Sequence, residues 1–220
     1  MAEKKIALIT EGISEQNVIK YVLQHYISEE PLINIAQPLT VNGKQQGPGG
    51  WHEVLKYCEN EGDLVERMKH NDYLVIQIDT DMCETKPYSV SRRDGAGNQL
   101  TEEQLWQAVV DKLKSKLPKS IDESRIIFAI STETIECWLL PICCVTETDK
   151  KHKNNCLSVL NSNLKRKGMR KISVGDKNSD SSRRAYSEIL KMMRKKKDIK
   201  SVASYHYGFK KFIEQLEQIA

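Results

Sequence analysis

The 220-residue sequence has no apolar run long enough to cross a membrane as a helix. Its longest apolar stretches, at 126–130 and 137–145, fall far short of the roughly 20 residues that a membrane helix needs. The N-terminus passes from charged residues straight into a short apolar run before Glu11 and has no small-residue cleavage site. We therefore expect a soluble, cytoplasmic protein, and 39% hydrophobic residues suffice for one domain over 1–220.

Paired metal-binding and redox motifs are also missing. The six cysteines show no C-x-x-C spacing, which argues against zinc ribbons and thioredoxin-like sites, so we expect reduced and mostly buried thiols. The five histidines are scattered and form no H-E-x-x-H motif. The glycine-rich stretch at 42–50 lacks the spacing of a phosphate-binding P-loop, and we interpret it as a flap beside a site.

Charge is divided unevenly along the chain. Residues 1–149 carry 15 Lys and Arg against 24 Asp and Glu, whereas residues 150–220 carry 19 against 6. A basic region of this kind is typical of polyanion binding, and an acidic region can hold cations. The alternative is that the lysine-rich helices only keep the surface soluble.

Short apolar runs alternate with helical patterns along the chain. The patterns predict strands at 4–10, 32–41, 73–79 and 125–130, and helices at 14–27, 51–61, 101–117, 131–140, 154–166, 182–197 and 208–219. Ser14 and Thr101 are the predicted helix caps, and Pro38 places the second strand at an edge or a bend. The sequence therefore predicts an α/β fold with a doubly wound, mainly parallel sheet flanked by helices, in which an acidic core at 1–149 precedes a basic helical region at 150–220.

Acidic side chains follow three of the predicted strands. Glu11 follows the first strand, Asp79 and Asp81 end the third, and Glu133 and Glu136 follow the fourth. The carboxyl ends of parallel strands share one edge of a sheet, so we expect these acids to meet there. Crowded carboxylates repel one another unless they are protonated or bind a cation, and Mg²⁺ or Mn²⁺ prefers oxygen ligands. For Asp79 and Asp81 alone, the alternative is a strand-end turn with Asx hydrogen bonds.

The residues around Glu11, Asp79 and Asp81 resemble those of a known domain family. The stretches LITEGISEQNVIKYVL (8–23) and YLVIQIDTD (73–81) resemble the Toprim domain, which has a glutamate after its first strand and a D-x-D after a later one. Further likeness at STETIECWLL (131–140) and SYHYGFKKFIEQL (204–216) is to small, single-domain Toprim-like proteins related to the nuclease domains of OLD-family proteins. The resemblance spans nearly the whole chain and implies a Toprim-like fold with Mg²⁺- or Mn²⁺-dependent phosphodiester chemistry on nucleic acid.

The resemblance also implies roles for individual acids. Glu11 matches the acid–base glutamate of the family, and Asp79 and Asp81 match its metal ligands. The full set of implied metal ligands is Glu11, Glu15, Asp79, Asp81, Glu133 and Glu136. One or two metal ions would neutralise the phosphate, activate water and stabilise the leaving oxygen, while a glutamate moves the proton.

The basic region would then hold the phosphate backbone. The candidate nucleic-acid-binding residues are Lys165, Arg166, Lys167, Arg170, Lys171, Arg194, Lys195, Lys196 and Lys197. From the resemblance we further expect a role in bacterial defence against phage or plasmids, DNA in preference to RNA as the substrate, and an ATPase as a possible partner protein.

Two other functions remain open. The first is a non-catalytic Toprim-like subunit that binds nucleic acid or regulates an ATPase complex. The second is a phosphatase with Asp79 as its nucleophile, because D-x-D is also the signature of haloacid dehalogenases. That signature normally lies on the first strand, and here it lies on the third.

Overall fold

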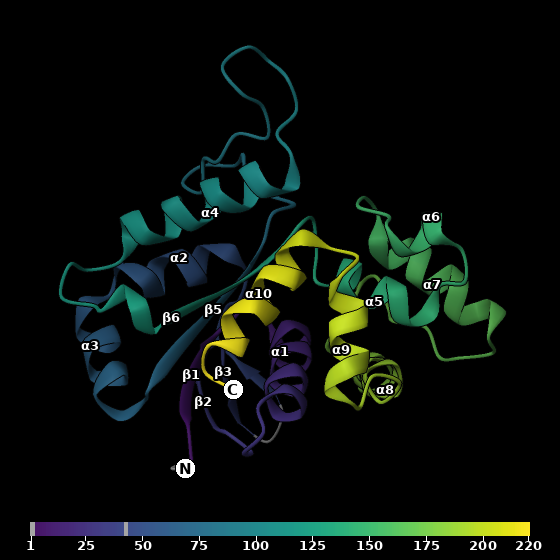
Figure 1. Cartoon of the computed structure of the whole chain (residues 1–220), viewed down its shortest axis with the longest axis horizontal. Helices are drawn as coiled ribbons and strands as arrows, with labels where there is room; N and C mark the ends of the chain where they lie inside the picture. Colours follow the sequence, from purple (N-terminus) through teal and green to yellow (C-terminus); the bar gives the residue numbers. More distant parts are fainter. Residues whose placement is uncertain (1–2, 42–43) are drawn as a thin grey trace.

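The computed structural model describes residues 3–41 and 44–220 and is built around a four-stranded sheet (Figure 1). Its strands are β1 (Lys5–Ile9), β2 (Leu32–Gln37), β5 (Tyr73–Asp79) and β6 (Ile126–Ser131), in the order β2-β1-β5-β6. All three pairings are parallel, which confirms the predicted parallel α/β arrangement. The chain runs outward from β1 to β2 and then returns past β1 to β5, so the winding reverses between β1 and β5.

Helices cover both faces of this sheet. The helices are α1 (Ile13–Tyr26), α2 (Trp51–Glu59), α3 (Glu61–His70), α4 (Glu102–Lys116), α5 (Glu136–Cys143), α6 (Glu147–Lys150), α7 (Cys156–Arg166), α8 (Asp180–Leu190), α9 (Lys196–Ala203) and α10 (Tyr207–Glu217), with a 3₁₀ turn at Glu123–Arg125. Ile6 and Leu8 pack with α1, α5 and α7 to α10, whereas Ala7 and Ile9 pack with α2, α3 and α4. Alternate strand residues therefore face two different cores, which explains why the strands are apolar almost throughout.

Helix α1 begins one residue earlier than the sequence pattern predicts, and helix α5 begins five residues later. Helix α1 begins at Ile13 with Gly12 as its N-cap, so the prediction that Ser14 caps it is wrong; the Ser14 hydroxyl donates to the Glu15 carboxylate instead. The helix expected at 131–140 begins only at Glu136. The reason is that Glu133 has a φ of +63°, which a right-handed helix cannot accommodate.

Two further helical predictions need correction. The single helix expected at 182–197 is divided into α8 and α9, because the chain turns between them and buries Met193 in the core. Helix α3 was not predicted, because it buries only Leu64 and Met68 and is otherwise charged. By contrast, the capping box at Thr101 is confirmed at the start of α4.

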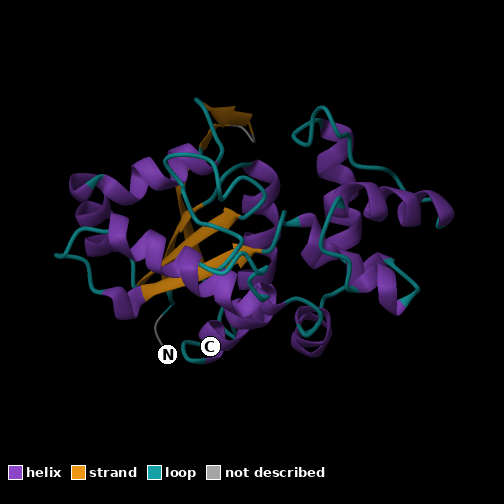
Figure 2. Cartoon of the chain, turned by 90° about the horizontal axis from the view of Figure 1, so that it is seen from above, coloured by secondary structure: helices purple, strands orange, loops and turns teal. Residues whose placement is uncertain are grey.

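The strand expected at 32–41 is interrupted at Pro38. Strand β2 lies at the edge of the sheet, as predicted, and β3 (Leu39–Val41) leaves it to pair with β4 (Lys44–Gln46) in an antiparallel hairpin that stands away from the main sheet (Figure 2). The predicted flap at 42–50 includes residues 42 and 43, which lie outside the described residues. Its end reaches the carboxyl edge of the sheet, because the Gly50 N–H donates to the Glu11 carbonyl at 2.7 Å.

The other edge of the sheet is covered by α10. The Gln215 side chain accepts from the Phe128 N–H at 2.9 Å and donates to the Phe128 carbonyl at 3.0 Å, as a neighbouring strand would. Helix α10 approaches so closely that a Cβ added at Gly208 would lie 1.9 Å from the Ile130 carbonyl oxygen. The end of β6 is thereby held in place. Within the described part of the chain, no helix has the length and apolar character needed to span a membrane.

Candidate acidic active site

The first two acids meet where the winding of the sheet reverses. Glu11 follows β1 and Asp79 ends the neighbouring strand β5. The Asp79 N–H donates to Glu11 Oε1 at 2.6 Å. Gln77 joins the same pair, because its Nε2 donates to Asp79 Oδ1 at 2.8 Å and its Oε1 accepts from the Glu11 N–H at 3.2 Å. Sequence reasoning missed Gln77, although a buried glutamine in an apolar strand, two residues before Asp79, is a usable signal.

Two adjoining hollows lie at this edge. The first, here called the strand-end hollow, has a volume of about 360 Å³, and its lining includes Glu11, Glu15, Asp79, Asp81 and Lys177. The second, here called the α7 hollow, has a volume of about 420 Å³. Its lining includes Glu133, Glu136, Asn155, Cys156 and Ser158, and it shares Asp81, Thr134 and Lys177 with the first. All six predicted metal ligands therefore line one or other of two joined hollows.

Burial and mutual repulsion raise the pKa values of the acids in the strand-end hollow. Burial, with the charges of Glu15 and Asp81, raises the pKa of Glu11 to about 8, even though the Asp79 N–H opposes the shift. Burial and then the charge of Glu11 raise the pKa of Asp79 well above its usual value. The pKa of Glu15 rises through burial and the charge of Glu136. The cluster therefore binds protons where water-exposed carboxylates would be ionised, and it would accept a cation in their place.

A lysine already lies among these acids. The Lys177 Nζ is 2.8 Å from Glu136 Oε1. Burial alone would lower the pKa of Lys177, but Glu136 and Glu15 raise it above its usual value, so the side chain carries a full charge. Sequence reasoning missed this residue, because it lies in the irregular segment between α7 and α8 and is one of many basic residues there.

Glu136 is fully buried and is held in its ionised form. Its Oε1 accepts from the Tyr186 hydroxyl at 2.5 Å and pairs with Lys177. Burial would raise the pKa of Glu136, but the charge and hydrogen bond of Lys177 together with the Tyr186 hydroxyl hold it below the usual value. Its Oε2 is buried and has no hydrogen-bond partner among the described residues. This oxygen can accept one further donor or cation.

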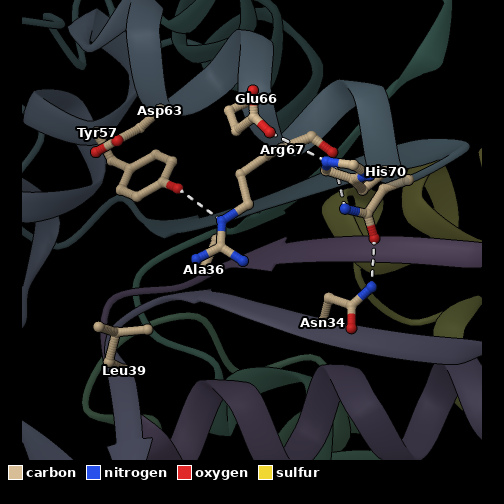
Figure 3. A pocket seen from close by; sticks show the side chains of 9 residues that line it. Asn34, Ala36, Leu39, Tyr57, Asp63, Glu66, Arg67 and His70 are labelled. Carbon is tan, nitrogen blue, oxygen red and sulfur yellow. Dashed lines mark hydrogen bonds and ion pairs between the residues drawn. The ribbon is translucent and has the colours of Figure 1, made fainter.

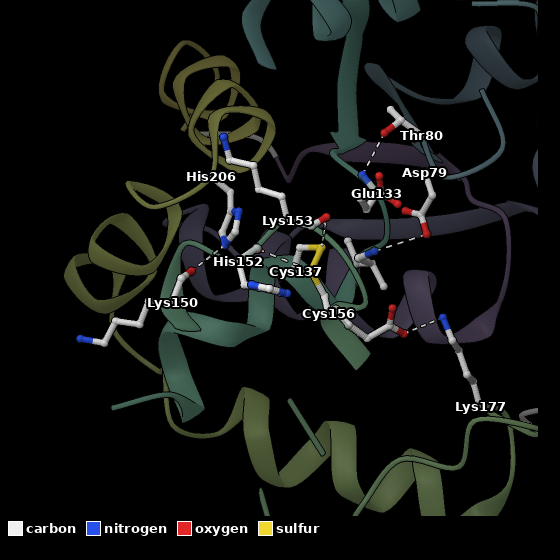
Figure 4. The surroundings of a disulfide bond; sticks show 12 residues. Asp79, Thr80, Glu133, Cys137, Lys150, His152, Lys153, Cys156, Lys177 and His206 are labelled. Atoms are coloured by element: carbon white, nitrogen blue, oxygen red, sulfur yellow. Dashed lines mark hydrogen bonds and ion pairs between the residues drawn. A yellow bond between two sulfur atoms is a disulfide. The ribbon is translucent and has the colours of Figure 1, made fainter. Parts of the chain in front are cut away.

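Glu133 has a different role from the other five acids. Its side chain pairs with Arg92, whose Nη1 lies 2.7 Å from Glu133 Oε1. Its backbone N–H donates to Thr80 Oγ1 at 2.8 Å (Figure 4). Its carbonyl accepts from the N–H groups of Thr80 and Asp81 at 2.9 and 3.2 Å. Glu133 therefore fixes the turn that carries the two aspartates, and Arg92 neutralises its charge.

The donor atoms suit a hard divalent cation, although the acids do not form a preassembled cage. Within residues 3–41 and 44–220, no three His, Cys, Asp or Glu side chains are grouped so that they could hold a metal ion as placed. Carboxylate oxygens are the ligands that Mg²⁺ and Mn²⁺ prefer, and Glu136 Oε2 is buried and unpartnered. The residues therefore fit such an ion by their chemistry, provided that the side chains around Lys177 turn toward it.

The predicted basic runs lie outside both hollows. Residues 165–171 form the exposed end of α7 and the segment that follows it. Residues 194–197 lie beside the far end of α1, where the Lys196 Nζ is 4.5 Å from the centre of the Tyr26 ring. Tyr26 is about 20 Å along the helix from Ile13, the end that faces the acids. Neither run lines the hollows, whereas Lys177 pairs with Glu136 and Arg92 pairs with Glu133.

The expectation of six reduced cysteines is wrong for two of them. Cys137 and Cys156 form a disulfide with their Cα atoms 5.0 Å apart (Figure 4). The packing of α5 against α7 brings them together, and their separation of 19 residues along the chain matches no motif. The remaining four are free and buried, as expected: Cys58, Cys83, Cys143 and Cys144.

A third hollow, of about 480 Å³, lies between α3 and the edge strand β2 (Figure 3). The Arg67 side chain crosses it, and its Nε donates to the Tyr57 hydroxyl at 3.2 Å. The acids that line it, Asp63 and Glu66, are exposed side chains of α3. It lies along the edge strand β2 and not at the switch point between β1 and β5, so it is a less suitable catalytic site than the acidic edge.

Many enzyme families place acids at the switch point of a parallel sheet, so the fold alone assigns no reaction. The function must be inferred from the side chains that line the strand-end hollow and the α7 hollow. No family model, no curated protein and no solved structure matches this chain.

Proposed function

We propose that this protein is a Toprim-type nuclease that uses Mg²⁺ or Mn²⁺ to cleave phosphodiester bonds in nucleic acid. The observation that carries the proposal is the hydrogen-bonded pair of Glu11 and Asp79 at the switch point, with Asp81 exposed beside it. The Toprim pattern has its glutamate and its D-x-D at the corresponding strand ends. The geometry at the switch point therefore supports the three residues to which the resemblance gives catalytic roles.

Three carboxylates would hold the ion. Asp81 is the exposed aspartate of the D-x-D and Asp79 is the buried one. Glu136 would contribute its Oε2, which has no hydrogen-bond partner among the described residues. A bound ion would neutralise the phosphate, lower the pKa of an attacking water and stabilise the leaving oxygen. The Tyr186 hydroxyl donates to the Glu136 carboxylate, and the Glu133 carbonyl accepts from the backbone N–H groups of Thr80 and Asp81. The surrounding structure therefore orients the carboxylates that would bind the ion.

Glu11 is the proposed proton carrier. Its pKa of about 8 lies close to neutral pH, where a carboxyl group can both take up and release a proton efficiently. Its Oε1 is fixed by the Asp79 N–H, so the carboxyl group keeps one orientation in the strand-end hollow. Lys177 supplies a positive charge at the same place, and a phosphate oxygen is a suitable partner for its ammonium group once a divalent cation engages Glu136.

The basic runs would contact nucleic acid that flanks the cleaved bond. Residues 194–197 lie about 20 Å from the acidic edge, measured along α1, which corresponds to several nucleotides of a bound strand. Such contacts hold the backbone without reading the sequence. In line with the Toprim resemblance, we propose DNA as the substrate, defence against phage or plasmids as the role, and an ATPase as the partner.

A non-catalytic function is the second candidate. Lys177 already neutralises part of the cluster, and the described acids form no preassembled three-ligand group. A subunit that binds nucleic acid and regulates a partner ATPase would not need a preassembled group of three metal ligands. Such a protein would bind DNA with or without divalent ions and would leave it uncut.

Cleavage of supercoiled plasmid, with matched single-stranded RNA beside it, tests the proposal. The parent should nick DNA with Mg²⁺ or Mn²⁺ and stop with chelator. Glu11→Gln should lose about 10²–10⁴-fold in rate while it still binds Mn²⁺, because only the proton carrier is removed. Asp81→Asn should lose cleavage and Mn²⁺ affinity together. Asp111→Asn, which removes an exposed acid of α4, is the matched control and should cut at the parent rate.

The outcomes separate the two candidates. Absence of metal-dependent cleavage, both alone and with the product of the neighbouring gene, would favour the non-catalytic function if DNA still binds. Cleavage at the parent rate by Glu11→Gln would remove Glu11 from the mechanism.

A further inference from the structure

The Cys137–Cys156 disulfide joins the two walls of the α7 hollow (Figure 4). Cys137 follows Glu136 directly in the first turn of α5, and Cys156 is the first residue of α7. Glu136 and Cys156 both line the hollow. The bond therefore fixes the start of α7 against the helix turn that carries a proposed metal ligand.

The bond is enclosed by the protein but borders an open space. Cys137 is fully buried and Cys156 is 2% exposed. The α7 hollow leads to Cys156 and has a volume of about 420 Å³, enough to admit a small thiol. Each sulfur also has an acceptor ready for a thiol hydrogen: the Lys153 carbonyl is 3.9 Å from Cys137 Sγ, and the His152 carbonyl is 3.5 Å from Cys156 Sγ. The dithiol form would therefore leave no S–H group without a partner.

The wall that the bond restrains is held in an unusual conformation. Asn155, immediately before Cys156, has a φ of +51° and provides no side-chain cap to α7. Left-handed backbone is uncommon outside glycine, although asparagine adopts it more readily than most residues. The disulfide is the covalent restraint next to this residue. Without it, the first turn of α7 would lose its covalent link to the first turn of α5.

We propose that the Cys137–Cys156 bond is a thiol-exchange site that controls the α7 hollow, and that its reduction loosens the first turn of α7 and weakens divalent-cation binding. The effect on cation binding rests on the proposed function, because it requires Glu136 and Asp81 to hold the ion. The loosening of α7 does not depend on that function. A cellular thiol reductant is the chemical class of the partner.

The exchange balances with a dithiol as the reductant. A thiolate of the reductant attacks the Sγ of Cys156, the cysteine of the pair that lines the hollow, and Cys137 leaves as a thiolate that takes up one proton. The second thiol of the reductant then displaces Cys156 and closes the reductant into a disulfide. Cys156 leaves at the N-terminus of α7, where the helix dipole stabilises a thiolate before it takes up its proton. Two electrons and two hydrogens pass to the protein.

The test compares the oxidised and reduced forms of the parent protein. Folded protein is treated with dithiothreitol, the reductant is removed under anaerobic conditions, and intact mass under denaturing conditions verifies the gain of two hydrogens. Calorimetry then measures Mn²⁺ affinity, and hydrogen exchange measures the amides of residues 155–160. In the reduced form we expect Mn²⁺ to bind on the order of tenfold more weakly, the usual effect of disturbing an outer-shell support, and the α7 amides to exchange faster.

Two variants complete the test. Cys137→Ser with Cys156→Ser should match the reduced parent and should not respond to dithiothreitol. Cys144→Ser, which removes a free thiol at the end of α5, should respond as the parent does. Even if the double variant folds poorly, the comparison of the oxidised and reduced parent tests whether reduction loosens α7 and weakens Mn²⁺ binding.

Several results would overturn the proposal. Resistance of the bond to dithiothreitol in the folded protein would make it a purely structural bond. Equal hydrogen exchange in the oxidised and reduced forms would show that the disulfide does not restrain α7. Equal Mn²⁺ affinity in the two forms would show that the disulfide does not affect cation binding. Failure of both forms to bind Mn²⁺ would instead refute the metal site of the proposed function and the effect of the bond on it, while hydrogen exchange would still decide whether reduction loosens α7.

Discussion

The Glu11 side chain accepts a hydrogen bond from the Asp79 backbone N–H at 2.6 Å. The two residues lie 68 positions apart in the sequence, at the carboxyl ends of neighbouring parallel strands: Glu11 follows β1, and Asp79 ends β5. The bond fixes the glutamate at the switch point of the sheet, while burial and nearby acids raise its pKa to about 8. One side chain thus combines a fixed position with a pKa near neutrality, and both properties suit a proton carrier.

Stability should depend on pH through Glu11. Its pKa is raised from 4.5 to about 8 in the folded state, so the folded state binds more protons than the unfolded state between these values. The free energy of unfolding should therefore fall as the pH rises through this range. Glu11→Gln should remove much of this loss and stabilise the protein by about 2 kcal/mol more at pH 8 than at pH 5. Urea unfolding of the parent and of Glu11→Gln at both pH values, without divalent ions, measures this difference in the free energy of unfolding.

The matched control for this experiment is Asp111→Asn, an exposed acid outside the hollows. Its stability difference from the parent should be the same at both pH values. An equal difference at pH 5 and pH 8 for Glu11→Gln would show that Glu11 does not carry the raised pKa.

Lys177 should compete with a divalent cation. Its ammonium group lies 2.8 Å from Glu136 Oε1, among acids that would hold the ion. Lys177→Met should therefore tighten Mn²⁺ binding by about tenfold, or about 1.4 kcal/mol. Cleavage should nevertheless fall, because a phosphate oxygen loses its partner. Lys119→Met, which removes an exposed charge outside both hollows, should change neither quantity. Weaker Mn²⁺ binding by Lys177→Met would show that the lysine supports the site rather than competing for it.

The two basic runs should affect nucleic-acid binding separately from chemistry. Neutral replacement of residues 194–197 should weaken DNA binding equally for all sequences and flatten its dependence on salt, because fewer counterions are released. Replacement of the basic residues within 165–171 should do the same. The rate of cleavage at saturating DNA should not change, since both runs lie outside the hollows. Salt dependence identical to that of the parent would identify a run as solvated surface.

Gly208 should be intolerant of a side chain. A Cβ there would lie 1.9 Å from the Ile130 carbonyl oxygen, and backbone atoms cannot yield as a side chain would. Gly208→Ala should therefore push α10 away from β6 and cost about 3 kcal/mol in the free energy of unfolding. Gly95→Ala is the control, because no atom lies within 4 Å of its added Cβ and its φ is not positive. Equal urea midpoints for the two variants would contradict the close approach of α10.

Local sequence patterns determined the parts of this protein that depend on short-range physics. Apolar runs of strand length between helical patterns predicted a parallel sheet, because such strands are buried on both faces. Acids that follow those strands had to gather at one edge, since parallel strands all end there. The capping box at Thr101 also followed from neighbouring residues alone.

Only the tertiary structure decided which side chains meet at that edge. Lys177 reaches Glu136 because the segment after α7 folds back over the site, and Tyr186 reaches the same carboxylate from α8. The disulfide and the Gln215 contacts with β6 likewise join segments whose separation follows no period. A sequence period describes the faces of one element, whereas these contacts depend on how whole helices pack against one another. The acids could therefore be named from the sequence, but the lysine, the tyrosine and the bond that surround them could not.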